Sequence, residues 1–248
     1  MLTSNIGRFA RRRTQLLIVF ALLLGAAAAL AAWHERREHL LARLVRADTE
    51  EVVKDRELTA FAQAMAKPLY AEHCARCHGA DMMGNSAVGA PNLTDKIWLF
   101  DNGDVFGIER TLLYGIRSGA SKSHNVTDMP AFGTTGRLSD AEIRNLVQYI
   151  DQLSGRPFRG QAAIEGRAAY FDAGGANCGE CHGADARGNS DYGAPDLTSN
   201  VWNGGGDDQA LHDAIYFGQH HIMPGFLASL SLAQIRALAV YIYMVSHS

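Results

Sequence analysis

Two five-residue stretches of the same form hold all four cysteines of this 248-residue chain. They are residues 74–78 (CARCH) and residues 178–182 (CGECH). In a C-x-x-C-H motif, two thiols one helical turn apart can bond both vinyl groups of a haem, and the histidine beside them can bind its iron. The motifs therefore predict two covalently attached haem c groups. Their predicted ligands are the thiols of Cys74, Cys77, Cys178 and Cys181 and the imidazoles of His78 and His182.

Cysteine pairs of this spacing have other uses. Two C-x-x-C pairs can bind one zinc ion, and a single pair can form a disulfide or a thioredoxin-like redox site. Against zinc, about a hundred residues separate the pairs, each pair is followed at once by His-Gly, and each has its own Met-Pro dipeptide further on. Against a redox disulfide, no alternation of strand and helix patterns surrounds either pair. Haem c attachment is the favoured interpretation.

The second axial ligand decides what each iron can do. A methionine opposite the histidine gives a closed haem for electron transfer, whereas an open position binds small molecules. Met129 and Met223 each precede a proline, which holds the methionine in extended backbone. We expect Met129 to pair with His78, because it lies far enough along the chain to pass around the ring. By the same reasoning Met223 pairs with His182. A nearby histidine could replace either methionine; the candidates are His124, His220 and His221.

An internal repeat surrounds the two motifs. Segment 84–98 aligns without a gap with segment 188–202, which lies 104 residues further on. The two segments share Gly-Asn-Ser, Gly-Ala-Pro and Leu-Thr. Repeat units of this length indicate two separate domains. Trp98 and Trp202 stand at equivalent positions, and we expect them to pack on the haem edge or to bond to it.

Helical patterns predominate along the chain, and almost no strand pattern is present. Residues 139–142 (SDAE) and 231–234 (SLAQ) have the form of capping boxes, each at the start of a run with apolar residues on one face. The sequence predicts an all-α protein, with two tandem class I cytochrome c domains behind one N-terminal transmembrane helix. The predicted segments are a tail and membrane anchor (1–35), an amphipathic helical spacer (36–66), a first cytochrome c domain (67–155) and a second (156–248).

An apolar stretch near the amino terminus suits a membrane anchor. Residues 15–33 include about 18 apolar residues without a charge, and arginines precede them at positions 8–13. That length can cross a bilayer. A cleaved signal peptide is the alternative, because the basic start and the small-x-small residues 29–31 are typical of one. The length of the run favours a retained helix in the bacterial inner membrane. Because haem c is attached on the outer side of that membrane, we expect the haem domains in the periplasm.

The formal net charge of −3 is unevenly distributed. Residues 156–248 carry five Lys+Arg against nine Asp+Glu. Nothing resembles the basic patch of a nucleic-acid-binding protein, so no nucleic-acid partner is expected. Haem propionates would add further negative charge, which favours a cationic redox partner.

With these residues in view, the chain resembles the dihaem subunit of cbb3-type cytochrome c oxidases, the FixP/CcoP family. The likeness runs from about residue 48 to the end. A Cys-His-Gly motif with Met-Pro is common to many small c-type cytochromes, but the ordered set in tandem behind an anchor is more specific. Beyond the haem motifs, the likeness rests on four further segments. They are residues 48–66 ahead of the first motif, residues 91–98 with PNLT and a tryptophan, residues 114–133 with YGIRSG and MPAFG, and residues 149–155 (YIDQLSG).

The resemblance implies a membrane-anchored electron-transfer subunit that has no oxygen site and no catalytic residue of its own. It would take electrons from a soluble cytochrome c or from the bc1 complex. It would pass them to the monohaem subunit of the oxidase and then to the haem-copper subunit. A free-standing anchored dihaem cytochrome, which carries electrons from a periplasmic dehydrogenase to an oxidase, is the alternative. A dihaem peroxidase with one open axial site is a third.

Overall fold

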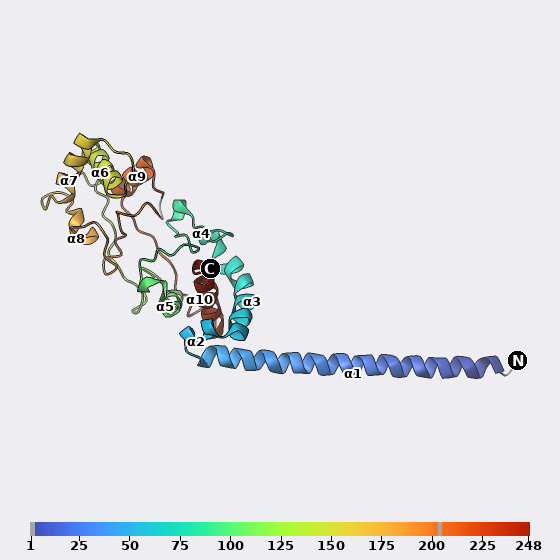
Figure 1. Cartoon of the computed structure of the whole chain (residues 1–248). Helices are drawn as coiled ribbons and strands as arrows, with labels where there is room; N and C mark the ends of the chain where they lie inside the picture. The colour runs from blue at the N-terminus through green and yellow to red at the C-terminus, as the bar shows by residue number, and fades with distance from the viewer. Residues whose placement is uncertain (1–2, 203–204) are drawn as a thin grey trace. The chain divides into compact units, whose positions relative to one another are not determined.

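The computed structural model describes residues 3–202 and 205–248, with side chains from residue 17 onward. Within these ranges the chain is helical and contains no strand, although isolated β-bridges join some loops. The chain divides into two compact units, Met1–Ala47 and Asp48–Ser248. Figure 1 shows the helices in chain order. The predicted all-α class is confirmed for the described residues, and positions 1–2 and 203–204 of the predicted segments lie outside them.

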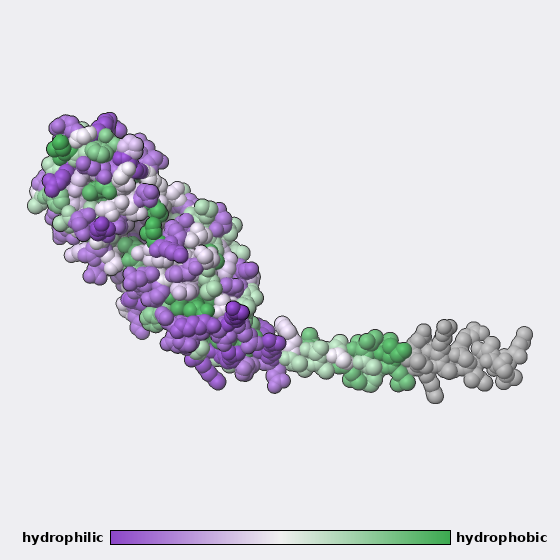
Figure 2. All heavy atoms as spheres, viewed as in Figure 1, coloured by the Kyte–Doolittle hydropathy of each residue, from purple (hydrophilic) through white to green (hydrophobic). Residues whose placement is uncertain are grey.

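The first unit is a single long helix, α1 (Thr3–Arg46). From Leu17 onward it has the length and composition needed to cross a membrane, as the sequence predicts. The apolar side chains of residues 17–33 are exposed, and Figure 2 shows a hydrophobic surface along this stretch. The helix also continues through the first eleven residues of the expected spacer, because residues 36–46 contain neither glycine nor proline to end it.

The second unit consists of short helices joined by long loops. Each cysteine motif forms a short helix, α4 or α8, between a longer helix and a long loop. The helices are α2 (Thr49–Lys54), α3 (Arg56–His73), α4 (Ala75–His78), α5 (Val105–Tyr114), α6 (Asp140–Leu153), α7 (Gly160–Tyr170), α8 (Cys178–His182), α9 (Asp208–Phe217) and α10 (Leu232–Ser246), with 3-10 turns η1 (Ser86–Val88) and η2 (Asp101–Gly103).

The two predicted capping boxes start α6 and α10. Glu142 N donates to Ser139 Oγ at 3.3 Å, and the Glu142 carboxylate accepts from Ser139 N at 2.7 Å. Ser231 and Gln234 form the same reciprocal pair. These bonds satisfy backbone donors that the start of a helix otherwise leaves open. Both helix predictions are thus confirmed, together with their first residues.

The final helices of the two repeats are exchanged. Helix α6, which ends the first repeat, packs against α7 and α9 of the second, and α10, which ends the chain, packs against α3 and α5 of the first. In Figure 1 the dark red α10 lies beside the cyan α3, and α6 lies beside α7 and α9. We define half A as α2 to α5 together with α10, and half B as α6 to α9.

Aromatic pairs accompany the exchange. Tyr241 of α10 meets Tyr70 of α3 edge to face, with ring centroids 6.1 Å apart. Tyr149 of α6 meets Tyr170 of α7 in the same way at 5.5 Å. The packing therefore crosses the expected boundary between the two cytochrome c segments, because each segment gives its last helix to the other. A repeat pattern predicts which residues form each helix, but it does not say which copy of a neighbour the helix packs against.

Candidate metal centres

Each cysteine motif folds as about one helical turn. Cys74 lies at the N-cap of α4 and Cys77 inside it, while Cys178 and Cys181 both lie in α8. Residues three apart on a helix share a face, so each pair of thiols can reach one ligand. All four cysteines are free thiols in the structure. Burial raises the pKa of Cys74 and of Cys178 to about 11, so both thiols are protonated at neutral pH.

The histidines beside these thiols are held in one tautomer. His78 Nδ1 lies 3.1 Å from the carbonyl oxygen of Pro91. His182 Nδ1 lies 3.0 Å from that of Pro195. Because a carbonyl oxygen only accepts hydrogen bonds, Nδ1 carries the proton and Nε2 keeps its lone pair for a metal. Burial lowers the pKa of both imidazoles, which favours the neutral form that binds iron.

A tyrosine stabilises the turn behind each motif. Tyr70 Oη donates to the Gly79 carbonyl at 2.8 Å, and Tyr170 Oη donates to the Gly183 carbonyl at 2.7 Å. Both glycines have φ near +80°, a conformation that other residues rarely adopt, so the chain turns sharply after each histidine. The cysteine motifs do not indicate these tyrosines, because one lies four residues before its first cysteine and the other lies eight.

Met129 lies in half B. It packs on the buried core formed by α6, α7 and α9, as Cys178 and Trp202 also do. Val126 of the same loop approaches Gly193 so closely that a Cβ on that glycine would lie 2.5 Å from a Val126 methyl carbon. Gly193 belongs to the loop that follows the second motif. The Met129 loop therefore packs at the second motif.

Met223 lies in half A. Its backbone pairs with Ile116, two residues beyond α5: Ile116 N donates to Met223 O at 2.9 Å, and Met223 N donates to Ile116 O at 3.0 Å. The His221 ring packs over Gly89, where a Cβ would lie 2.3 Å from a ring carbon. Gly89 belongs to the loop that follows the first motif and is the repeat equivalent of Gly193. The Met223 loop therefore packs at the first motif.

The structure thus differs from the pairs expected from sequence. We expect His78 with Met129 on sequence spacing alone, whereas the structure brings Met129 to the other motif. It likewise brings Met223 to the half that contains His78, and not to that of His182. The reason is the exchange of the final helices. Each Met-Pro loop leads directly into the helix that is exchanged, so the loop lies in the same half as that helix.

Comparison with known proteins identifies the family. Residues 62–150 and 161–242 match the family described as cytochrome c oxidase, cbb3-type, subunit III. The chain belongs to this family. The cbb3-type cytochrome c oxidase subunit FixP of Bradyrhizobium sp. (strain ORS 278) is 39% identical over 204 residues, which are 82% of this chain and 68% of that protein. Subunit CcoP of Cereibacter sphaeroides is 34% identical over 212 residues, 86% of this chain and 71% of the relative.

Membership of the cbb3 subunit III family confirms the resemblance, and two covalently bound haem c groups are its cofactors. The structure offers groups that fit them. Trp98 Nε1 and Trp202 Nε1 are buried, and neither has an acceptor within residues 3–202 and 205–248. An indole N–H can only donate, and leaving it buried without an acceptor costs about 1–3 kcal/mol. A haem propionate would supply that acceptor, and one such donor is present in each half.

The three histidines that could replace a methionine make other contacts. His124 stacks on Phe100 with ring centroids 4.2 Å apart. His220 Nδ1 lies 2.7 Å from a carboxylate oxygen of Asp128. The His221 ring covers the loop that follows the first motif. These contacts leave the methionines as the better candidates for the second axial position.

A zinc site finds no support in the part of the chain that the structure describes. No group of three or more His, Cys, Asp or Glu residues is arranged there to hold a metal ion. A structural zinc ion needs four such ligands, and the two cysteine pairs lie in different halves. The haem interpretation of the motifs requires only one cysteine pair and one histidine per half, which is what each half contains.

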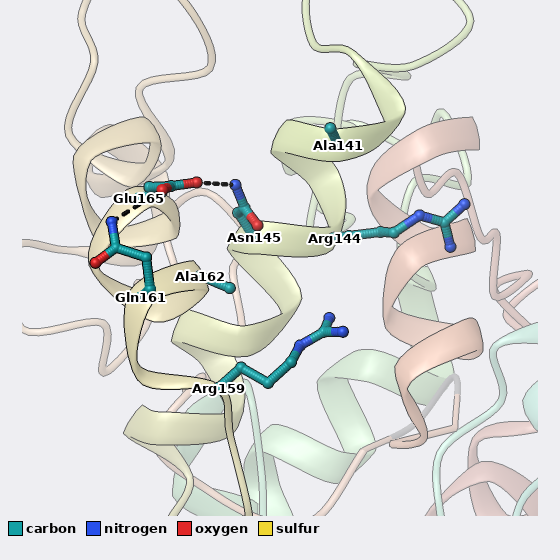
Figure 3. Close-up of a pocket in the computed structure, with 7 residues that line it drawn as sticks. All are labelled: Ala141, Arg144, Asn145, Arg159, Gln161, Ala162 and Glu165. Atoms are coloured by element: carbon teal, nitrogen blue, oxygen red, sulfur yellow. Dashed lines mark hydrogen bonds between the residues drawn. The ribbon is translucent and has the colours of Figure 1, made fainter.

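A polar hollow of about 460 Å³ lies between α6 and α7, and no motif residue lines it. Figure 3 shows Glu165 at its wall, where the carboxylate accepts from Asn145 at 2.8 Å and from Gln161 at 3.0 Å. Arg144, which extends from the opposite wall, is bound to Asp140 at 2.6 Å. Glu165 and Arg144 are therefore engaged with protein, and we assign the hollow no part in the haem chemistry.

Proposed function

We propose that the chain relays electrons as the membrane-anchored dihaem subunit of a cbb3-type terminal oxidase. One observation carries the proposal: the chain belongs to this family, and each of its halves contains two thiols, a histidine held in one tautomer and a Met-Pro loop. Its relatives are named as subunits of such an oxidase. A soluble cytochrome c or the bc1 complex supplies the electrons. The monohaem subunit receives them and passes them to the haem-copper subunit.

The axial ligands are assigned in crossed pairs. His78 and Met223 bind the iron of the first haem, and His182 and Met129 bind that of the second. The packing of each Met-Pro loop against the loop that follows the other repeat's motif supports this assignment. The covalent attachment sites are Cys74 and Cys77 for the first haem, and Cys178 and Cys181 for the second.

Bound haem c supplies a one-electron iron couple, whose potential a methionine ligand raises. The residues of the chain hold this couple in place. The carbonyls of Pro91 and Pro195 orient the two imidazoles. The indoles of Trp98 and Trp202 would donate to the propionates. Held by a histidine and a methionine, each iron would carry electrons without binding small molecules, and oxygen reduction would fall to the haem-copper subunit.

Helix α1 anchors the subunit, and the haem-bearing unit lies on the periplasmic side, where haem c is attached. The candidate span within α1 supports the anchor. The excess of acidic residues in positions 156–248 supports a cationic electron donor, because opposite charges steer two redox proteins together.

Affinity purification of the tagged full chain from detergent-solubilised membranes tests this function. We expect the monohaem and haem-copper subunits to co-purify in a constant ratio, with oxidase activity towards reduced cytochrome c. Deletion of the gene should abolish that activity. A tagged single-span membrane protein without haem serves as the control. Recovery of the dihaem chain alone, with oxidase activity intact in the deletion strain, would support the free-standing carrier.

The crossed pairs are tested in a chain that retains only the first haem, made by Cys178→Ala with Cys181→Ala. In this background Met223→His should lower the potential of the remaining haem and remove its sulfur-to-iron absorption band, because a thioether favours ferrous iron more than an imidazole does. Met129→His in the same background is the matched control and should change neither property. The opposite result would restore the pair of His78 with Met129.

A further inference from the structure

Two glycines occupy the same place beside the two Met-Pro loops. Gly115 follows α5 and Gly218 follows α9. Their backbone angles are nearly identical, with φ 77° and ψ −173° at the first and φ 75° and ψ −180° at the second. This region is accessible almost exclusively to glycine. The conformation is therefore repeated in both halves, although the residues that follow the two glycines differ.

Each glycine lies directly against the backbone of a proposed methionine ligand. A Cβ built on Gly115 would lie 2.3 Å from Met223 O and 2.8 Å from the Pro224 carbonyl carbon. A Cβ on Gly218 would lie 2.5 Å from Met129 O, in the Met-Pro loop of the other repeat. Ordinary contacts begin near 3.5 Å, so a side chain at either glycine would push the Met-Pro backbone away by about 1 Å.

Paired hydrogen bonds hold the same contact from the next residue. The bonds between Ile116 and Met223 run in both directions, at 2.9 and 3.0 Å. In half B, Met129 N donates to Gln219 O at 3.2 Å, and Gln219 N donates to Met129 O at 3.1 Å. Two mutual bonds fix the methionine backbone only while the preceding glycine allows the two chains to approach this closely.

The loops also use backbone acceptors at the helix ends. The last carbonyls of a helix have no partner within it. Phe226 N, three residues after Met223, donates to Leu112 O of α5 at 2.8 Å. Phe132 N, three residues after Met129, donates to Ile215 O of α9 at 3.1 Å. Each ligand loop is thus bound along the end of the helix that precedes the glycine.

We propose that Gly115 and Gly218 are positioning residues for the sulfur ligands, Gly115 for Met223 and Gly218 for Met129. The inference deepens the proposed function, because it rests on the crossed axial pairs. Each glycine belongs to one repeat and positions the ligand that the other repeat supplies. Each haem site consequently contains residues of both repeats, and a direct backbone contact joins the two repeats there.

Gly115→Ala tests the proposal, with Gly119→Ala as the matched control. Gly119 lies in the same loop at φ +80°, but a Cβ there would meet nothing within 4 Å. Both variants therefore strain the backbone at positive φ, and only the first displaces Met223. We expect Gly115→Ala to keep two covalent haems while it loses half of the near-infrared sulfur-to-iron band. Its ferric form should bind added imidazole at one haem, and Gly119→Ala should retain the full band without binding imidazole.

The mirror experiment uses Gly218→Ala with Gly136→Ala. Gly136 has φ +70° and no atom within 4 Å of a built Cβ. In the chain that keeps only the first haem, Gly115→Ala should abolish the band and Gly218→Ala should leave it unchanged. A full band in both glycine variants, without imidazole binding, would overturn the proposal. A parent protein without any sulfur-to-iron band would instead refute the ligand set itself, which separates the two claims.

Amide hydrogen exchange on the unchanged chain provides a measurement that does not depend on a variant folding. The mutual bonds should slow exchange at Ile116 and Met223 at least tenfold relative to the exposed Ile222. Exchange at Met223 as fast as at Ile222 would show that the backbone contact does not hold the ligand loop, and would overturn the proposal for half A.

Discussion

In half A, α10 is joined to α5 by a buried ion pair, whereas in half B, α6 is joined to α9 by a histidine and a carboxylate near the surface. Arg236 Nε lies 3.1 Å from Glu109 Oε1, and Thr49 Oγ1 donates to the same buried carboxylate at 2.5 Å. His212 Nε2 lies 2.8 Å from Asp140 Oδ1, and that carboxylate is half exposed. The bonds that orient His78 and His182, the proposed iron ligands, are in contrast alike in the two halves.

The contact in half B distinguishes the two similar final helices. Asp140 of α6 has Leu232 as its equivalent in α10. If α10 packed on α9, His212 would face a leucine in place of a carboxylate. If α6 packed on α5, Arg144, the equivalent of Arg236, would be available to pair with Glu109. The bond between His212 and Asp140 therefore favours the exchanged arrangement. An arginine for Glu109 and a proline carbonyl for each motif histidine are available in either arrangement.

The largest effect is expected when Glu109 is removed. Glu109→Ala leaves the Arg236 guanidinium in a buried place without this carboxylate, and breaking such a pair typically costs 3–5 kcal/mol, so we expect a loss of about 3 kcal/mol. Chemical denaturation of the dihaem protein, followed by helical circular dichroism, measures the free energy of unfolding. Glu72→Ala, on an exposed part of α3, is the control. Equal losses in the two variants would show that the ion pair does not stabilise half A.

An intermediate and equal effect is expected at the two tyrosines. Tyr70→Phe and Tyr170→Phe each remove one hydrogen bond to a glycine carbonyl, at 2.8 and 2.7 Å. Such a bond contributes about 1 kcal/mol, so both variants should lose a similar amount in the same denaturation experiment. Tyr192→Phe, on an exposed loop, is the matched control. A loss confined to one variant would mean that the two halves do not hold their motifs alike.

Local features of this molecule were accessible from the sequence because neighbouring residues determine them. The capping boxes at Ser139 and Ser231 follow from residues three positions apart, and the one-turn motif helices follow from five-residue patterns. The bond from His78 to Pro91 spans 13 residues of irregular loop. No periodic pattern describes such a loop, so the sequence indicates the candidate metal ligand but not the group that orients it.

The exchange of α6 and α10 could not be predicted from the repeat, because α3 and α7, on which they pack, both bury small residues and a tyrosine. The distinguishing information lies where the repeats differ. Glu109 and His212 occupy equivalent places in α5 and α9, and the partner of each lies on the final helix of the other repeat. Motif spacing along one chain cannot detect such contacts, which is why the expected methionine pairs followed chain order.

The smallest effect is expected at Asp140 in acid. Hydrogen bonds from His212 and then Arg144 hold the pKa of this carboxyl below its ordinary value of 3.8. A group whose pKa is lower in the folded than in the unfolded protein adds stability above the unfolded value, and this contribution is lost as the pH falls through the folded value. Asp140→Asn should therefore be slightly less stable than the parent at neutral pH, and the difference should close below pH 3.8.

Denaturation midpoints of the parent and of Asp140→Asn, measured from pH 7 down to pH 3, test this dependence. His212→Gln removes the strongest of the two hydrogen bonds to Asp140 and should reproduce part of the effect. A constant gap between Asp140→Asn and the parent at every pH would mean that the ionised carboxylate does not join α6 to α9, and the contrast between the two halves would then rest on the buried pair alone.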